Sequence, residues 1–398
     1  MTDVRSQRSR GITQLAEALV EAERIVRSAP HVDDERDLAE GLDYLAGLVK
    51  VAVGSAWAGD PADPHFARPS TPWTKMGLDN PDTLYFAAQI TGEAEYVVTG
   101  TRGTCADLVF QALGGSHAGS TAPASHLAFD DRDFPVAADG SFELRFGPPR
   151  ADAGPGYLTL APDSSRLLVR QTFSDWTTER PGTLRVQRTD RIGMPSPPVT
   201  LETIESRYAR AGGILLGYVR TFLEFVELFY LDQPANTMYA PKSTPGGLTS
   251  QFSSAGHYDL REDQALVVTV PASQMPYQGM QLGSRWYVSL DYANHQTSLT
   301  TEQAHADPDG NIRFVVSHRD PGLANWLETT GHDKGYLQIR WQRVDRPLTE
   351  ADGPTTEVMA FADLPERLPF HREQRVTPEQ WSRRIAARQA AVADRMLS

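Results

Sequence analysis

The most chemically suggestive segment of the chain is a short turn that carries two carboxylates and a phenol. Asp79 and Asp82 flank Asn80-Pro81, a turn signal, and Tyr85 follows. Two carboxylates three positions apart in a tight turn can come close, and close carboxylates raise the pKa of one of them. This pattern suits acid–base catalysis, with Asp79 and Asp82 as acid or base, Tyr85 as a proton donor and Asn80 as a substrate-binding group. The alternative is an Asx-turn, in which Asp side chains accept backbone N–H groups and hold the bend.

A second cluster follows the end of a predicted strand. The run from Arg170 to Arg180 contains Asp175, Trp176 and Glu179. Loops and strand ends carry binding and catalytic groups more often than strand centres do. Asp175 and Glu179 are therefore further acid–base candidates, and Trp176 is expected to line a pocket. The alternative is structural, with an ion pair of Arg170 and Asp175, or of Arg180 and Glu179, beside a packed indole.

A third cluster lies in the last third of the chain. Trp326 belongs to a Pro- and Gly-containing segment that begins at Asp320, and His332 and Arg340 follow it. An exposed Trp on a loop can stack on a sugar or an apolar ring. We expect Trp326 and Arg340 to bind substrate and His332 to be a reserve acid–base group. The alternative for Trp326 is burial in a sandwich core.

Tyr239 and Lys242 lie in an irregular stretch, 233–256, that separates two more regular parts of the chain. Pro- and Gly-punctuated loops of this kind often carry function. We expect Tyr239 and Lys242 to polarise or protonate a bound substrate. Together with the three clusters, they complete the set of candidate site residues.

Familiar cofactor motifs are missing from the sequence. It contains no P-loop, no Gly-rich dinucleotide fingerprint that opens a helix, and no nucleophile elbow. The ten His residues are scattered, and the single Cys, Cys105, excludes thiolate zinc sites, iron–sulfur clusters and internal disulfides. We therefore expect no cofactor and no local metal site, while a metal site assembled from distant residues stays open.

Composition narrows the class of protein. Lys and Arg number 38 against 51 Asp and Glu, which gives a formal net charge of −13. This acidic balance argues against nucleic-acid and anionic-membrane partners, which need a basic surface. No secretory leader is recognisable, and the longest apolar stretch, 213–219, is too short to span a bilayer. We expect a cytoplasmic protein whose partner is a small-molecule ligand or substrate; whether it forms a homo-oligomer stays open.

The elements that must position these residues are mostly strands. Hydrophobic periodicity predicts a helical N-terminal segment (1–58), a first β-region (59–199), a long helix (200–232), a second β-region (233–346) and a C-terminal extension with a terminal helix (347–398). Asp33 or Asp34, Thr200 and Thr377 are suitable helix N-caps. The clearest strands are 96–99, 108–113, 142–146, 157–160, 167–172, 183–188, 266–270, 286–290, 312–317 and 336–341.

Two segments resemble known bacterial families. The run Asn80-Pro81-Asp82-Thr83-Leu84-Tyr85 resembles the N-x-D-T-x-Y signature of the domain-of-unknown-function family numbered 1254. The stretch from 286–290 through Asp309-Gly310 and Asn325-Trp326-Leu327 to Arg340-Trp341 resembles the companion family numbered 1214. The resemblance implies an immunoglobulin-like or related β-domain followed by a jelly-roll-like β-sandwich, with helical insertions. It implies little about chemistry.

The sequence thus predicts a mainly β protein with helical additions and two β-sandwich-like regions. Its candidate residues favour a cofactor-independent enzyme that acts on a small organic molecule by acid–base chemistry, as a lyase, isomerase or hydrolase. The alternative is a non-catalytic β-sandwich module that binds carbohydrate, a small ligand or protein through Trp-bearing loops.

Overall fold

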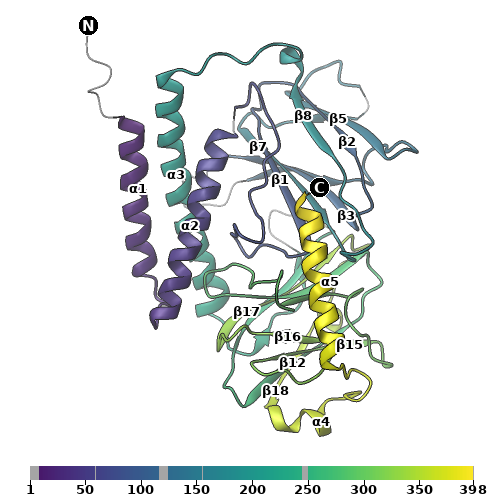
Figure 1. Cartoon of the computed structure of the whole chain (residues 1–398). Helices are drawn as coiled ribbons and strands as arrows, with labels where there is room; N and C mark the ends of the chain where they lie inside the picture. The colour runs from purple at the N-terminus through teal and green to yellow at the C-terminus, as the bar shows by residue number, and fades with distance from the viewer. Residues whose placement is uncertain (1–8, 59, 116–123, 155, 244–249, 398) are drawn as a thin grey trace.

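Two β-sandwiches and a layer of helices make up the molecule (Figure 1). The computed structural model describes residues 9–58, 60–115, 124–154, 156–243 and 250–397. Five α-helices and 18 strands, arranged in four sheets, are present in those ranges. The predicted fold class, mainly β with helical additions and two sandwich-like regions, is therefore confirmed.

The first sandwich pairs two four-stranded sheets. One has the order β1 (Thr83–Gln89), β7 (Ser164–Thr172), β3 (Asp107–Gly114) and β4 (Ser125–Asp130); the other has the order β6 (Tyr157–Thr159), β5 (Ser141–Gly147), β2 (Tyr96–Thr101) and β8 (Leu184–Arg188). Alternation in β5 points Phe142, Leu144 and Phe146 into the shared core and leaves Glu143 exposed. Gly140, at φ +82°, forms the tight turn that precedes β5.

The second sandwich is built in the same way from a six-stranded and a four-stranded sheet. The larger contains β9 (Thr237–Met238), β10 (Lys242–Ser243), β11 (Phe252–Asp259), β17 (Lys334–Gln342), β13 (Tyr277–Gly283) and β14 (Ser298–Thr300). The smaller contains β16 (Trp326–Glu328), β15 (Asn311–Ser317), β12 (Gln264–Pro271) and β18 (Thr355–Ala360). Because β18 pairs with β12 along the sheet edge, this sandwich extends past residue 346, the end of the predicted second β-region.

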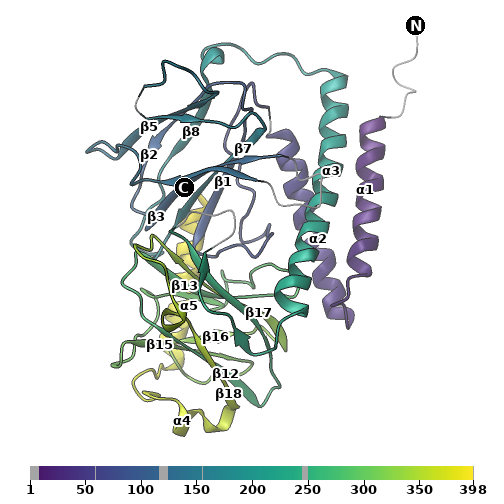
Figure 2. The same ribbon diagram turned by 180° about the vertical axis from the view of Figure 1, so that it is seen from behind.

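Three helices form a layer along one side of both sandwiches (Figures 1 and 2). They are α1 (Arg10–Arg27), α2 (Glu35–Trp57) and α3 (Leu201–Val226), and the Asp34 and Thr200 side chains cap α2 and α3 as expected. Gly212 lets α1 approach α3, since an added Cβ there would lie 3.2 Å from the Cβ of Ala18. In the described ranges, none of the helices combines the length and apolar character needed to cross a membrane.

The C-terminal helix α5 (Pro378–Leu397) lies against both sandwiches, and the short helix α4 (Leu364–Arg367) precedes it (Figures 1 and 2). Thr377 and Gln380 form the predicted capping box, with N–H to side-chain distances of 2.7 and 3.2 Å. Arg395 donates to the Pro81 carbonyl in the first sandwich, while Arg388 donates to the Tyr292 carbonyl beside the second. The helix therefore clamps the two sandwiches together.

The predicted strand 286–290 is wrong. The chain reverses there, with Tyr287 at φ +56° and an isolated bridge between Gly283 and Ser289. Trp286 causes the departure because its indole is buried against α2 and donates to the Asp37 carbonyl at 2.8 Å. The apolar and aromatic residues of this segment therefore anchor a loop to the helical layer instead of pairing in a sheet.

Candidate functional site

The turn before β1 is held by its two carboxylates, each through a different partner. Asp79 accepts hydrogen bonds from the Ser289 backbone N–H (3.0 Å) and hydroxyl (2.8 Å). Asp82 accepts from the Trp176 indole and the Tyr277 hydroxyl, both at 2.8 Å. Both carboxylates are buried, at 3% and 1% exposure, and burial raises the pKa of Asp82 despite these donors. These contacts tie both carboxylates to distant segments, so neither forms the Asx-turn that was the alternative interpretation of the sequence.

Asn80 forms the bend itself. Its side-chain oxygen accepts the Asp82 backbone N–H at 3.0 Å, an Asx-turn, and its amide nitrogen donates to the Tyr277 hydroxyl at 2.9 Å. The Asn80 backbone N–H donates to the Tyr85 hydroxyl oxygen at 3.0 Å. The Tyr85 phenol therefore has a fixed orientation and keeps its own proton for another acceptor.

Beside this turn is a cavity of about 270 Å³, here named the polar chamber. It lies where β1 and β7 of the first sandwich meet β11 and β17 of the second. Its polar lining includes Asn80, Tyr85, Arg170, Gln251, Gln338 and Arg340. The chamber thus joins the predicted residues Asn80, Tyr85 and Arg340 to one arginine of β7.

Arg170 is the unusual member of this lining. It is the register partner of Tyr85 in the β1–β7 pair, and its side chain is only partly exposed. No hydrogen bond or carboxylate partner engages its guanidinium in the part of the chain that the structure describes. Burial, with the nearby charges of Arg166 and Arg340, lowers the pKa of Arg170, while Tyr85 and Asp107 oppose this shift. A partly buried guanidinium without a direct ion pair loses hydration that no carboxylate replaces, so the chamber favours an anion.

Arg340 supplies a second guanidinium to the polar chamber. It donates to the Leu78 carbonyl at 2.6 Å and to the side-chain oxygen of Gln281. Both acceptors are uncharged, so they orient Arg340 without neutralising it. Two guanidinium groups that line one cavity can bind a carboxylate or phosphate group through charge-assisted hydrogen bonds.

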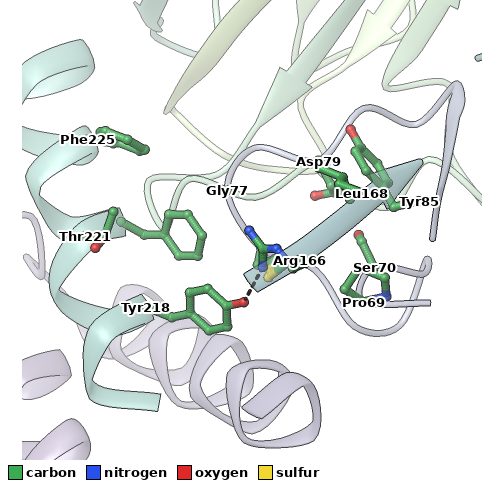
Figure 3. Close-up of a pocket in the computed structure, with 12 residues that line it drawn as sticks. Pro69, Ser70, Gly77, Asp79, Tyr85, Arg166, Leu168, Tyr218, Thr221 and Phe225 are labelled. Atoms are coloured by element: carbon green, nitrogen blue, oxygen red, sulfur yellow. Dashed lines mark hydrogen bonds between the residues drawn. The ribbon is translucent and has the colours of Figure 1, made fainter. Parts of the chain in front are cut away.

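A second cavity, of about 230 Å³, adjoins the first and is here named the apolar chamber (Figure 3). Met76, Leu168, Tyr218, Phe222 and Phe225 form its apolar walls, and the polar residues Ser70, Asp79, Arg166 and Thr221 also line it. Arg166 donates to the Tyr218 hydroxyl at 3.3 Å. Gly77 and Tyr85 line both chambers.

The predicted residues of the second cluster lie outside both chambers. Asp175 accepts from the hydroxyls of Thr177 and Thr178, each at 2.7 Å, in an Asx-type turn; burial opposes them, but these bonds lower the Asp175 pKa. The Trp176 ring is buried between Arg388 and Arg395, whose guanidinium carbons lie 4.4 and 4.0 Å from its centroid. The expectation that Trp176 lines a pocket is corrected, because its ring is used to dock α5.

Trp326 is likewise a packing residue. Its ring is buried against Trp381 of α5, with centroids 4.9 Å apart, and its indole donates to the Ser317 carbonyl at 3.1 Å. The expected exposed stacking platform is therefore corrected to a core contact. The indole N–H of Trp326 thus has a buried acceptor, and its ring packs against another aromatic ring. Both the polar and the apolar part of the side chain are satisfied in this way.

The other candidates lie at separate places. The His332 nitrogens are 2.7 Å from the Glu40 carboxylate and 2.8 Å from the Thr329 carbonyl, in a different groove along α2. The Lys242 ammonium lies 4.8 Å from the Tyr239 ring centroid on the exposed edge formed by β10. Burial raises the pKa of Tyr239. These three residues do not join Asp79 and Asp82 in one constellation.

Sequence reasoning missed Arg166 and treated Arg170 only as half of an ion pair with Asp175, a pair that does not form. The signal was present in β7, where Arg166, Leu168 and Arg170 alternate with the buried Leu167 and Val169. Two arginines on the outer face of one strand, in a chain of net charge −13, place positive charge locally where an anion could be attracted.

A metal centre is not apparent at the described positions. No group of three or more His, Cys, Asp or Glu side chains within those ranges is arranged to hold an ion. Cys105 is buried, and burial raises the pKa of its thiol to about 11. A thiol in that environment is unreactive at neutral pH.

Comparison with solved structures finds a similar fold in an uncharacterised protein from Burkholderia cenocepacia. The two sequences are 29% identical, and the match covers 89% of this chain and 98% of that chain with a TM-score of 0.81. A protein from Vibrio parahaemolyticus matches 88% of this chain and 99% of its own, at 11% identity and a TM-score of 0.46. No family model matches the chain. No curated protein matches it.

Proposed function

We propose that this protein binds a small organic anion in the polar chamber, with Arg170 and Arg340 holding the anionic group. The observation that carries the proposal is the partly exposed Arg170 guanidinium, which makes no hydrogen bond or direct ion pair with the described residues, although the charge of Asp107 acts on it at longer range. Isolated buried charges are rare because their desolvation is not compensated. A bound carboxylate or phosphate would supply the missing partner.

Charge distribution supports the same proposal. The chain as a whole carries a net charge of −13, yet Arg166, Arg170 and Arg340 gather at the junction of the two sandwiches. Asp79, the carboxylate nearest to them in the chamber linings, is already occupied by Ser289. A local positive potential in a concave site attracts and retains anions.

The test is a ligand screen with a matched pair of variants. A panel of small organic acids is added to the purified full chain, binding is detected by thermal shift, and hits are measured by calorimetry. Arg170→Gln should weaken binding about tenfold or more, since a hydrogen bond to a charged group contributes about 1.5–3 kcal/mol. Arg185→Gln, at an exposed position of β8, is the control and should bind as the wild type does. Equal affinity in the wild type and Arg170→Gln would refute the proposal.

Acid–base catalysis is the second candidate function, and Tyr85 is the observation that favours it. Its oxygen is fixed by the Asn80 N–H while its proton is directed to no described acceptor. It also lines both chambers, beside the proposed anion site. Tyr85 is therefore the group best placed to donate a proton to a bound substrate, as a lyase, isomerase or hydrolase requires.

Tyr85→Phe separates binding from catalysis. It removes the hydroxyl and keeps the ring, so the acids found in the screen should still bind. Product formation from them, followed by mass spectrometry, should fall about 100-fold or more, the usual contribution of a positioned acid or base. Unchanged turnover in Tyr85→Phe would assign any activity to other groups, and absence of product with the wild type would leave a binding module.

We also propose a cytoplasmic location and a relationship to the families numbered 1254 and 1214. Asn80, Thr83 and Tyr85 of the segment that resembles the first family line the polar chamber together with Arg340 of the segment that resembles the second. Fractionation of the native host, with immunodetection of the chain, tests the location.

A further inference from the structure

We infer that the ligand is an amphipathic carboxylic acid, whose carboxylate lies in the polar chamber and whose aryl or alkyl body lies in the apolar chamber. This inference rests on the proposed anion site and adds the chemical class of the ligand. Four observations lead to it: the row of side chains on the outer face of β7, the position of Tyr85 in the lining of both chambers, the volume of the apolar chamber and the hydrogen-bond partners of its polar groups.

The outer face of β7 presents Arg166, Leu168 and Arg170 in a row. Residues two apart on one strand face lie about 6.6 Å apart, so Leu168 is one such step from the anion site. Across the strand pair, Tyr85 is opposite Arg170 and Ala87 is opposite Leu168. The polar and apolar surfaces therefore follow one another along the same two strands.

The two chambers meet at Tyr85 and Gly77, which line both. In Figure 3, Tyr85 and Asp79 lie at one end of the apolar chamber, and Phe225 and Tyr218 of α3 lie across from them. A molecule held by its carboxylate near Arg170 would thus extend past the Tyr85 ring toward α3.

The size of the apolar chamber suits a ring or a short chain. Its volume is about 230 Å³. An engineered apolar cavity of about 150 Å³ is known to take up benzene, so an aryl group with a short linker fits here. Aromatic walls such as Phe222 and Phe225 favour a ring through edge-to-face or offset contacts.

The two charged groups that line the apolar chamber have hydrogen-bond partners, whereas the buried Thr221 hydroxyl has none among the described residues. The Asp79 carboxylate accepts two hydrogen bonds from Ser289, and Arg166 is bonded to the Tyr218 hydroxyl. What remains for a ligand is mostly apolar surface, including Leu168 and Met76. A strongly polar body would lose more hydration there than the Thr221 hydroxyl and the Arg166 guanidinium could replace with hydrogen bonds.

The experiment compares three probes by NMR titration of the full chain: acetate, 3-phenylpropionate and the uncharged 3-phenylpropan-1-ol. Burial of a phenyl group should make 3-phenylpropionate bind at least tenfold more tightly than acetate. The alcohol, which lacks the carboxylate, should also bind at least tenfold more weakly than 3-phenylpropionate. Equal affinities for acetate and 3-phenylpropionate would overturn the inference and leave the proposed anion site intact. If neither acid binds, the proposed function itself fails.

Variants then locate the body of the ligand. Leu168→Gln places an amide in the wall of the apolar chamber and should weaken 3-phenylpropionate at least fivefold while leaving acetate unchanged. Leu201→Gln, at the exposed start of α3, is the control and should alter neither probe. Unchanged acetate binding shows that Leu168→Gln has folded. Retention of wild-type affinity for 3-phenylpropionate in Leu168→Gln would place the body elsewhere and overturn the inference.

Discussion

At the scale of single residues, the structure distinguishes side chains that hold the fold through hydrogen bonds from side chains that are available to bind a ligand. Asp79 and Asp82 are ionisable, close in sequence and conspicuous, yet each is bonded to two donors. Arg170 is less conspicuous in the sequence and has no partner among the described residues. A residue type and its spacing predict which chemistry is conceivable, whereas availability depends on partners that come from distant segments.

Replacing Asp82 tests its anchoring role. Asp82→Ala would leave the Trp176 indole N–H and the Tyr277 hydroxyl without their buried acceptor. The expected loss is about 3 kcal/mol in the free energy of unfolding, measured with urea, because each orphaned donor costs about 1–3 kcal/mol. Asp82→Asn keeps an acceptor oxygen and should lose less than half as much. A loss below about 0.5 kcal/mol in Asp82→Ala would refute the anchoring role.

Replacing Arg170 should have the opposite effect on stability. Arg170→Met removes an enclosed charge and keeps much of the aliphatic volume, so we expect the ligand-free chain to become more stable by about 1 kcal/mol. The same variant should lose anion binding. Urea unfolding measures the first effect and calorimetry the second. A marked destabilisation by Arg170→Met would mean that Arg170 has a structural partner and would remove the main support for the anion site.

At the scale of elements, the site depends on how the helical layer and α5 hold the loops between the sandwiches. Trp286 anchors the loop that carries Ser289, the partner of Asp79, by packing its ring against Tyr44 and His31. The Trp176 ring is held in the same way by the arginines of α5. Burial lowers the pKa of both Arg388 and Arg395 to about 10.

The free energy of unfolding should depend on pH through His31, which packs against Trp286. His31 is 1% exposed and has no hydrogen-bond partner within the described ranges. Burial and the charge of Arg285, opposed by Asp37 and Asp33, lower its pKa from 6.5 to about 4. A lowered pKa means that the fold favours neutral His31. Its contribution is therefore complete above pH 6.5 and is lost as the pH falls to about 4.

The pH effect is measured by comparing two proteins. Between pH 6.5 and 4, the wild type should lose about 3 kcal/mol more unfolding free energy than His31→Phe, since one pKa unit corresponds to about 1.4 kcal/mol. The variant keeps an aromatic ring against Trp286 and cannot be protonated. Parallel pH profiles for the two proteins would show that His31 does not titrate as its burial implies.

Much of the element pattern could be predicted from the sequence. The strand predicted at 142–146 and the capping residues Thr200 and Thr377 rest on local rules and are confirmed. Strands such as β13, Tyr277–Gly283, were missed because every residue is buried and two are Gly, so no period of two appears. The predicted strand at 286–290 is wrong because the contact of Trp286 with α2 outweighs the local propensity.

At the scale of the whole molecule, the chambers exist because two sandwiches and α3 meet. Each chamber is lined by segments far apart in the chain, for example Tyr85 with Arg340, or Leu168 with Phe225. Local sequence reasoning identified Asn80, Tyr85 and Arg340 as candidates but could not predict that the outer face of β7 lies toward them. It also predicted that Trp176 and Trp326 belong to the site, but both rings pack against residues of α5 instead.

Ligand binding should stabilise the entire fold, since the proposed site requires both sandwiches to be in place. An acid added at 100 times its dissociation constant should raise the unfolding free energy by about 2.7 kcal/mol. The same addition to Arg170→Gln should have a much smaller effect, while the exposed-site control Arg185→Gln should match the wild type. Calorimetric unfolding scans record these shifts. Equal stabilisation of the wild type and Arg170→Gln would place the ligand outside the polar chamber.

The most direct test of the anion site is a crystal structure of the full chain with 3-(4-bromophenyl)propionate. The account predicts carboxylate oxygens about 2.7–2.9 Å from the Arg170 guanidinium, the usual distance of a charge-assisted hydrogen bond. It also predicts an anomalous bromine peak in the apolar chamber, near Leu168 and Phe225. A bound acid whose carboxylate lies away from Arg170 would contradict the account.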